Sequence, residues 1–405
     1  MIPAIAWRNI WRNKTRSGVI ILSVTLGLWG GIFIMALSAG VSEQRKQDVI
    51  YNYLSHMQIH HPEFGDERQI EDVIPDGQQV WKRVSEQPHV AHATARTLSI
   101  GMANSPNDAA GVQIIGIWPD AERTVTNMAQ KIKEGTYFEE EMRNPVVIGA
   151  ALASQLDIKL RSKVVLTFQD STNNIVAGAF RVQGIFETAS TEFDKGMVYV
   201  RASDMARLME TDPLVHEIAI LVEEEEEQLA TVQSNLQQAF PQLAVENWKQ
   251  LSPELRYLDE AMDYFLYIFI AVILLALAFG LVNTMLMAVL ERTRELGMLM
   301  AIGMNKGRVF SMIVLETLYL ALFGGILGIG LSTVTIAYFA EAGIYLPMVE
   351  EGMSSYGMSA TLYPILDWSY FPGLIAMVLF FALLSALYPA YKALKLKPVV
   401  AIRKI

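Results

Sequence analysis

Cysteine is missing from all 405 residues of the sequence, so no disulfide bond stabilises any part of the protein. The pattern G-x-x-x-x-G-K-[ST] is missing too, which excludes ATP binding through a P-loop. No nucleophile, base and orienting group occur together as catalysis requires. We therefore expect no enzymatic activity, no catalytic residue and no bound cofactor in this chain, and a fold that its hydrophobic core alone stabilises.

Charged residues are scarce, at 18% against 52% hydrophobic residues, and they avoid four long stretches. These stretches are residues 18–40, 264–290, 309–340 and 368–391, and only the third contains a charge. Each reaches the roughly 20 apolar residues that cross a bilayer as a helix. The first has an alternative interpretation as a cleaved signal peptide, but it exceeds the roughly 7–15 apolar residues of a signal core. We therefore predict a membrane protein with four transmembrane helices.

Basic residues indicate how these helices are oriented. Residues 1–17 contain four basic residues and no acidic one, and all charged residues of 392–405 are basic. Because lysine and arginine in short loops stay on the cytoplasmic side, both ends are predicted to be cytoplasmic, together with the loop 291–308. Residues 41–263 and 341–367 then lie on the extracytoplasmic side of the membrane. The larger of these two segments has 19 basic and 35 acidic residues, which argues against nucleic acid as a partner.

The segment 1–17 has features of a helix of its own. Trp7 and Trp11 lie near each other on a helical projection, and basic residues occupy its other faces. This arrangement indicates a cytoplasmic elbow helix that lies in the membrane interface. The alternative interpretation is that the basic residues only set the topology.

Helical stalks are predicted on both sides of the extracytoplasmic segment. From Leu251 to Phe265, apolar residues recur at spacings of three and four, and Ser252 followed by Pro253 is a typical helix start. This helix and the second apolar stretch are predicted to form one rod of about 38 residues, roughly 57 Å long. Residues 41–56 are predicted to form the second stalk.

The segment 41–263 alternates between strand-like and helix-like patterns. Strands are predicted at Met57–His60, Leu98–Met102, Val112–Ile117, Val146–Ile148, Lys163–Gln169, Ala179–Glu187, Met197–Val200 and Glu217–Val222. Helices are predicted at Val80–Glu86, Ala150–Leu156, Ser203–Met209 and Glu224–Phe240. The predicted fold is therefore four transmembrane α-helices with a large α+β extracytoplasmic (periplasmic) domain between the first and second helices.

The loop 291–308 is more structured than a turn requires. Three apolar residues and a glycine lie on one face of a predicted helix, and two glutamates lie on another. A solvent-exposed turn needs no apolar face, so we predict a helix that docks on a cytoplasmic partner. The residues predicted to make this contact are Glu291, Arg292, Arg294, Glu295, Leu296, Leu299, Met300 and Gly303.

Glu316 is the one charge inside a predicted span. An ionisable side chain in the membrane is costly, and it is by default a candidate for function. Glu316 follows Arg308 by about two helical turns. Two interpretations stand, one in which the carboxylate reaches the cytoplasmic edge and one in which it pairs with Arg308.

Three other patterns have simpler explanations. The four glycines of residues 324–330 lie in an apolar stretch, where small residues let helices pack closely. Glu223–Glu227 begins a predicted helix and complements its dipole, with a docking patch for a basic partner as the alternative. We predict no metal site at His56, His60 and His61, because no carboxylate or thiol accompanies them at a supporting spacing.

These segments together resemble the permease subunits of the MacB/FtsX/Lol superfamily of ABC transporters, the mechanotransmission or type VII class. The matching segments are AWRNIWRNKTRSG, NTMLMAVLERTRELGMLMAIGMNKGRV, LETLYLALFGGILG and PAYKALKLKPVVAIRKI. The segments PVVIGAALASQLDIKLRSKVVLTF and FRVQGIFETASTEFDKGMVYV are most similar to the lipoprotein-releasing LolC/LolE-type permeases. The block ERTRELG is closer to the MacB branch, and the hairpin between residues 163–169 and 179–186 is shorter than the hook of the carrier-docking Lol subunit.

The resemblance implies partners and a location. It implies a separate cytoplasmic ABC ATPase that binds ATP and Mg, a second permease copy or paralogue in a dimer, and the bacterial inner membrane. It also implies a lipoprotein or other acylated cargo held between the first two spans and their stalks, where Leu26, Met262 and Phe265 are expected to line the cavity. A periplasmic carrier or adaptor stays open as a further partner.

Three alternatives remain at this point. One is a MacB-like exporter of peptides or drugs that works with a periplasmic adaptor. Another is an FtsX-like signalling permease that activates a cell-wall hydrolase and moves no cargo. The third is a membrane enzyme without an ATPase.

Overall fold

The computed structural model describes residues 2–65, 70–139, 142–170, 172, 174–355 and 357–395. The chain divides into two compact units. The first unit consists of Met1–Ser42, Asp259–Tyr345 and Thr361–Ile405, and the second consists of Glu43–Leu258 and Leu346–Ala360. Most of the predicted cytoplasmic tail, from Leu396 onward, lies outside the described residues.

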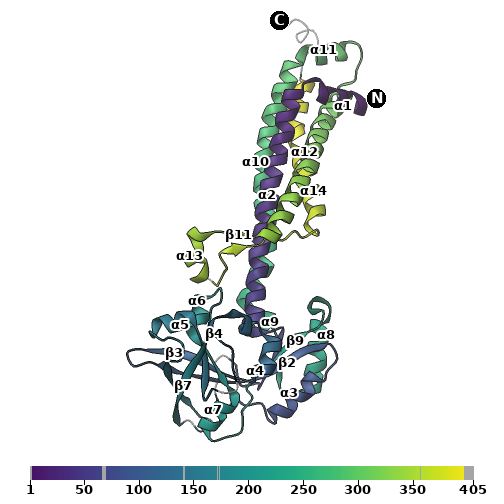
Figure 1. Ribbon diagram of the computed structural model, residues 1–405. Helices are drawn as coiled ribbons and strands as arrows, with labels where there is room; N and C mark the ends of the chain where they lie inside the picture. The colour runs from purple at the N-terminus through teal and green to yellow at the C-terminus, as the bar shows by residue number, and fades with distance from the viewer. Residues whose placement is uncertain are drawn as a thin grey trace. The chain divides into compact units, whose positions relative to one another are not determined.

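The first unit is a helical bundle (Figure 1). Its described helices are α1 (Ile2–Arg12), α2 (Lys14–Val49), α10 (Pro253–Glu291), α11 (Thr293–Ala301), α12 (Lys306–Ala342) and α14 (Tyr370–Leu394). Of the described helices, α2, α10, α12 and α14 are long and apolar enough to cross a membrane, which confirms the four predicted spans. Two short strands, β11 (Ile344–Tyr345) and β12 (Thr361–Leu362), pair antiparallel.

Helices α2 and α10 are longer than a membrane crossing requires. Helix α10 starts at Pro253, as the Ser252–Pro253 pair predicts, and it continues without interruption for 39 residues. The boundary between the two units falls inside both helices. In α10 it lies between Leu258 and Asp259, and in α2 it lies between Ser42 and Glu43. Each stalk and its span are therefore one helix.

The glycines of α12 lie where this helix packs against α2. A Cβ atom at Gly324 would lie 2.7 Å from the side chain of Val24, and one at Gly328 would lie 3.0 Å from that of Leu28. Between them, the hydroxyl of Thr25 donates a hydrogen bond of 3.2 Å to the carbonyl of Gly324. Close helix packing thus explains these two glycines.

We expect Gly328→Val to destabilise the bundle, because the added side chain overlaps α2. Overpacking of this kind costs about 1–3 kcal/mol, and thermal unfolding of the purified protein would show it as a lower midpoint. Gly330→Val is the matched control, since a Cβ atom there has no atom within 4 Å. Equal midpoints for the two variants would contradict the packing argument.

The second unit is built on a mixed β-sheet. Its described strands are β1 (Met57–His60), β2 (Val90–Asn104), β3 (Ala109–Ile117), β4 (Ile132–Gly135), β5 (Pro145–Gly149), β6 (Lys163–Gln169), β7 (Ile175–Phe186), β8 (Met197–Arg201), β9 (Glu217–Val222) and β10 (Ala244–Asn247). The strands β2, β3, β8, β5, β7 and β6 pair in this order, and β6 pairs back to β2. These strands therefore close a ring, whose buried side chains include Val146, Leu166, Phe180 and Val200.

Strand β4 pairs with β7. The other three strands extend the sheet from the first half of β2. Strand β9 pairs with β2 from Val90 to Arg96, β1 pairs with β9, and β10 forms the edge. Helices α3 (Gly77–Ser85) and α8 (Glu225–Ala239) cover this part through a core that includes Ile59, Ile218 and Leu236. The remaining helices are α4 (Pro119–Val125), α5 (Ala150–Gln155), α6 (Thr191–Gly196), α7 (Ala202–Met209), α9 (Trp248–Leu251) and α13 (Glu350–Ser355), with 3₁₀ turns at Met128–Lys131 and Pro347–Val349.

The mixed α and β character of this unit is confirmed, and several elements match their predicted bounds. The predictions for β1, β6 and β9 agree residue for residue with the structure. The predicted strand Leu98–Met102 covers only part of the second half of β2, which has 15 residues. The elements β4, β10, α4, α6 and α9, of four to seven residues each, are missing from the prediction.

The stalk that follows the first span changes form near its end. Helix α2 ends at Val49, and Ile50–Leu54 forms a π-helical turn in which the N–H of Ser55 donates to the carbonyl of Ile50 at 2.7 Å. Ser55 then has φ 61°, in the left-handed region that side chains rarely adopt. Turns of this kind occur often at functional sites.

A buried arginine connects this turn to the sheet. Arg96 in β2 has no exposed surface, and its guanidinium donates to the carbonyl of Tyr53 at 2.7 Å. It also donates to the carboxylates of Glu122 and Glu217, each at 2.6 Å. Both glutamates are as buried as Arg96, so this ion triad lies entirely inside the domain.

Candidate coupling site

Helix α11 is the segment predicted to dock on a partner, and the structure places its apolar face inward. Leu296 is 3% exposed in the core of the bundle, and Leu299 and Met300 pack against that core. These apolar residues therefore seat α11 on its own chain. The exposed side of the segment presents Arg294 and Ile302 instead, and Ile302 is 85% exposed.

Residues at the two ends of α11 mark its boundaries. Glu291 ends α10, and Arg292 precedes the first residue of α11. Gly303 follows the helix with φ 102°, a value that glycine adopts without strain, and it is exposed. Met298, which is 43% exposed, adds an apolar contact to the outer side of the helix. The surface left for a partner thus combines one arginine with two apolar side chains.

Glu316 is buried in α12, and two arginines bind its carboxylate. Nη2 of Arg16 donates to Oε1 of Glu316 at 3.2 Å, and Nη1 of Arg292 donates to the two oxygens at 3.2 and 3.3 Å. Glu316 is 3% exposed, so these charges are largely removed from solvent. Of the two interpretations, pairing is correct, but Arg308 is not the partner; it is exposed on the first turn of α12.

The pairing continues from Glu316 to α11 and α1. Arg292 also donates to Glu295 at 3.2 Å, and Arg12 at the end of α1 donates to the same carboxylate at 2.5 Å. Arg16 in addition lies 3.9 Å from Glu291. We call this set the ionic cluster; its members are Arg12, Arg16, Glu291, Arg292, Glu295 and Glu316. Three arginines and three glutamates from α1, α2, α10, α11 and α12 thus meet with balanced charge.

The pKa of Glu295 depends on this cluster. Hydrogen bonds from Arg12 and Arg292 hold the pKa of the Glu295 carboxyl below its usual range. Because its folded-state pKa is depressed, the stabilising contribution of this carboxylate is present above the unfolded-state pKa. It is lost as the pH falls through the lowered value.

The elbow segment positions Arg12 and Arg16 by a break in the helix. Asn13 separates α1 from α2, and its side chain accepts from the N–H of Arg16 at 3.4 Å, as an N-cap residue does. Trp7 in α1 packs against Tyr319 and Phe323 of α12, with ring centroids 5.9 and 5.3 Å apart. The separate elbow helix is therefore present, and aromatic contacts hold it on α12. Its place in a membrane interface stays a prediction.

The three residues expected to line a cargo cavity do not meet in one chain. Leu26 is 49% exposed and Phe265 is 68% exposed, whereas Met262 packs against the bundle core. Gly27, next to Leu26, approaches the side chain of Leu277. Phe265 lies about 18 Å from that level along α10. These positions therefore lie at different depths of the bundle, and a cargo cavity shared by them stays a prediction.

Each of the three histidines has a carboxylate nearby. His56 lies 3.4 Å from Glu225, and His60 lies 3.7 Å from Glu217. The acids near His56 and His60 come from α8 and β9, far away in sequence, so the spacing around the histidines does not reveal them. Glu225 also accepts from Trp248 at 2.8 Å, so the acidic run Glu223–Glu227 is more than a solvated helix cap.

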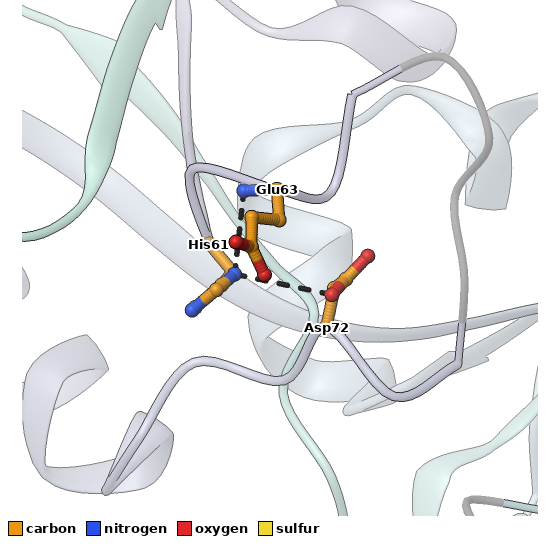
Figure 2. Close-up of side chains that lie close together, drawn as sticks. All are labelled: His61, Glu63 and Asp72. Carbon is orange, nitrogen blue, oxygen red and sulfur yellow. Dashed lines mark hydrogen bonds and ion pairs between the residues drawn. The ribbon is translucent and has the colours of Figure 1, made fainter.

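His61 has two acidic neighbours, Glu63 and Asp72 (Figure 2). Its Nδ1 lies 4.0 Å from Asp72 and accepts the backbone N–H of Glu63 at 3.3 Å. That lone pair is therefore already used, and a metal ion needs it free. Glu63 is also exposed. This geometry does not favour a metal site over a local loop contact.

Two protein families match the chain. The family of MacB-like periplasmic core domains matches residues 17–239, and that of FtsX-like permease C-terminal domains matches residues 267–398. The first match alone covers more than half of the sequence. The chain is an ABC transporter permease of the MacB/FtsX/LolC type. The resemblance found from the sequence motifs is thereby confirmed.

Three relatives of the permease share low sequence identity with it. LolC of Haemophilus influenzae, a lipoprotein-releasing system transmembrane protein, is 22% identical over 97% of the permease and 96% of LolC. The macrolide export ATP-binding/permease protein MacB of Escherichia coli K12 is 24% identical over 86% of the permease and 54% of MacB. An uncharacterised ABC transporter permease of Methanocaldococcus jannaschii, MJ1507, is 25% identical over 67% of the permease and 65% of MJ1507. The permease thus spans less than two thirds of MJ1507 and about half of MacB.

A solved structure with similarity to the permease is the periplasmic region of MacB from Actinobacillus actinomycetemcomitans. It has 16% sequence identity and a TM-score of 0.36, and it covers 50% of the permease and 94% of its own chain. The extracellular domain of the transporter YknZ from Gram-positive bacteria has 14% identity and a TM-score of 0.34, over 47% of the permease and 98% of that domain.

Proposed function

We propose that the permease couples ATP hydrolysis in a separate cytoplasmic ABC ATPase to the extraction or release of a membrane-seated cargo. The observation that carries this proposal is the ionic cluster, which joins α11 to the helices of the bundle. A movement of α11 displaces Arg292 and Glu295, and through them Arg12, Arg16 and Glu316. The proposed ATPase itself binds ATP and Mg, since the sequence contains no P-loop.

The exposed side of α11 is the proposed contact with the ATPase. Arg294, Met298 and Ile302 offer one charge and two apolar side chains, a composition suited to a groove of a partner. In the orientation predicted from the basic residues, this side and both termini lie on the cytoplasmic face of a bacterial inner membrane. The second unit then lies in the periplasm.

A second permease copy or a paralogue is the proposed partner within the membrane. Phe265 and Phe279 on α10 are 68% and 70% exposed, so this face is available for another chain or for lipid. Lipoproteins are the proposed cargo, because the similarity to LolC extends over nearly the whole of both chains. In a dimer, Leu26 and Phe265 face the partner copy and the acyl chains.

Glu295→Lys tests the coupling role. The new ammonium group would face Arg12 and Arg292, so we expect the ionic cluster to open at α11. Stimulation of the copurified ATPase by the permease should be lost, while the amount of permease in the membrane stays unchanged. Glu341→Lys, at an exposed glutamate near the end of α12, is the control with the same change of charge. Undiminished stimulation in Glu295→Lys would remove the coupling role.

Export of peptides or drugs is the second candidate, favoured by the similarity to MacB. The two candidates differ in what copurifies from native membranes. An acylated protein together with an ATPase supports lipoprotein release. A periplasmic adaptor without acylated protein supports export.

A further inference from the structure

Two buried histidines complete the hydrogen bonding at the two ends of strand β9. On one side of the strand β1 does not extend as far as Val222, and the N–H of Val222 donates to Nδ1 of His56 at 3.0 Å instead. At the other end β2 continues beyond its pairing with β9, and the N–H of Leu98 donates to Nδ1 of His216 at 3.2 Å. Each imidazole thus accepts an N–H group at a place where the neighbouring strand has ended.

Both imidazoles have to be neutral to make these bonds. A ring nitrogen accepts an N–H only through its lone pair, and in the imidazolium form both ring nitrogens carry hydrogen. Nε2 of His216 lies 3.0 Å from the carbonyl of Ile70, so a neutral ring with its hydrogen on Nε2 satisfies both neighbours. Protonation of His216 breaks the bond from Leu98, and protonation of His56 breaks the bond at the other end of the strand.

The surroundings of His56 favour its neutral form. Its side chain is 4% exposed, and burial lowers its pKa below the ordinary value. The carboxylate of Glu225 in α8, 3.4 Å from Nε2, acts in the opposite direction but does not outweigh burial. The phenol ring of Tyr51 is the other titratable group beside this imidazole, with ring centroids 5.8 Å apart.

His216 is fully buried, and burial lowers its pKa as well. The carboxylates of Asp72 and Glu217 act in the opposite direction, and Glu217 is itself paired with Arg96. The folded-state pKa of each histidine thus lies below the unfolded-state value of about 6.5, so the neutral rings contribute stability above that pH. This contribution is lost as the pH falls from about 6.5 toward the lowered values.

We propose that β9 is an acid-sensitive element of the second unit, in which protonation of His56 and His216 frees both ends of the strand. In the predicted orientation, the medium outside the cytoplasm supplies the protons. Glu217, the first residue of β9, binds the Arg96 that holds the π-helical turn. Loosening of β9 therefore weakens the join between α2 and the sheet. This inference goes beyond the proposed function and requires neither a cargo nor the ATPase.

The test is amide hydrogen exchange of the full permease in lipid nanodiscs, followed by mass spectrometry and divided by the intrinsic exchange rates. Measurements at about pH 7.5 and about pH 5.5 lie on either side of the ordinary histidine pKa. We expect the opening equilibrium constant at Leu98 and at Val222 to rise about tenfold between them, because an exposed histidine takes up a proton over this interval. An unchanged constant in the wild-type protein would overturn the proposal, so the test does not depend on the folding of a variant.

Variants assign the rise to the two histidines. Asparagine carries an acceptor, Oδ1, near the position of Nδ1 and cannot be protonated. His216→Asn should therefore abolish the rise at Leu98, and His56→Asn should abolish it at Val222. His92→Asn, at an exposed histidine of β2, is the matched control and should keep both.

The variants also separate this effect from other titrating groups. Burial raises the pKa of Asp194 in α6 to about 6, so this carboxyl stabilises the folded state on acidification and acts against the histidines. Its contribution is the same in the wild type and in each histidine variant, and it cancels in the comparison. A rise that persists when both histidines are replaced, or that disappears in His92→Asn, would overturn the proposal.

Discussion

Replacing Glu316 by alanine is expected to destabilise the bundle more than any other substitution in the ionic cluster. The variant leaves Arg16 and Arg292 facing each other, and their side chains are only 11% and 15% exposed. Removing one partner of a buried ion pair costs about 3–5 kcal/mol, and a loss near the lower end is expected here, because Arg16 and Arg292 keep only the more exposed carboxylates of Glu291 and Glu295. Thermal unfolding of the purified permease would show this loss directly. Stimulation of the proposed ATPase should fall with it.

Two comparisons make this prediction specific. Glu291→Ala removes a carboxylate that is 54% exposed and 3.9 Å from Arg16, so a loss of at most about 1 kcal/mol is expected. In a double-mutant cycle, Glu316→Ala combined with Arg292→Met should cost less than the sum of the two single losses, because the second change removes an uncompensated charge. If Glu316→Ala unfolds at the same temperature as Glu291→Ala, the cluster has no structural role.

Arg96→Met is expected to have a similarly large effect in the second unit. Without the guanidinium, Glu122 and Glu217 remain as two carboxylates at 0% and 1% exposure, and the carbonyl of Tyr53 loses its donor. We expect a loss of about 3–5 kcal/mol, measured as a shift of the urea midpoint followed by circular dichroism. The control is Lys195→Met, which breaks an ion pair with Glu192 in which both side chains are exposed, at 44% and 73%.

The outcomes of these two variants separate burial from charge pairing. A surface pair such as that of Lys195 contributes about 0–1 kcal/mol. A loss of that size in Arg96→Met would mean that water reaches the two carboxylates, and it would contradict the buried triad. Recovery of stability on adding Glu122→Gln to Arg96→Met would support the triad, since one of the two uncompensated charges is removed.

The sequence predicts the spans and the strands β1, β6 and β9 well, because each has a signal carried by its own residues. Apolar length indicates the membrane helices, and alternation indicates strands such as Lys163–Gln169. The pairing of β6 with β2 that closes the ring cannot be predicted from such local patterns. It depends on pairing between Gly101–Asn104 and Val165–Phe168, segments that are far apart in sequence.

Helix α11 shows the limit of an amphipathic pattern most clearly. The pattern of Leu296, Leu299 and Met300 correctly indicates that one face is covered. It does not say what covers it, and in the structure the cover is the permease's own bundle. The partners of Glu316 are hidden for a related reason, since Arg292 and Arg16 precede it by 24 and 300 residues and share no helical spacing with it.

The join between α2 and the sheet bears on how the second unit responds when the helix moves. A helix that ends in a loose turn absorbs a small axial shift by fraying. Here the final carbonyls belong to a π-helical turn, and one of them, at Tyr53, is bonded to Arg96 in the middle of β2. A displacement of the end of α2 is therefore transmitted directly to β2, the longest strand of the sheet.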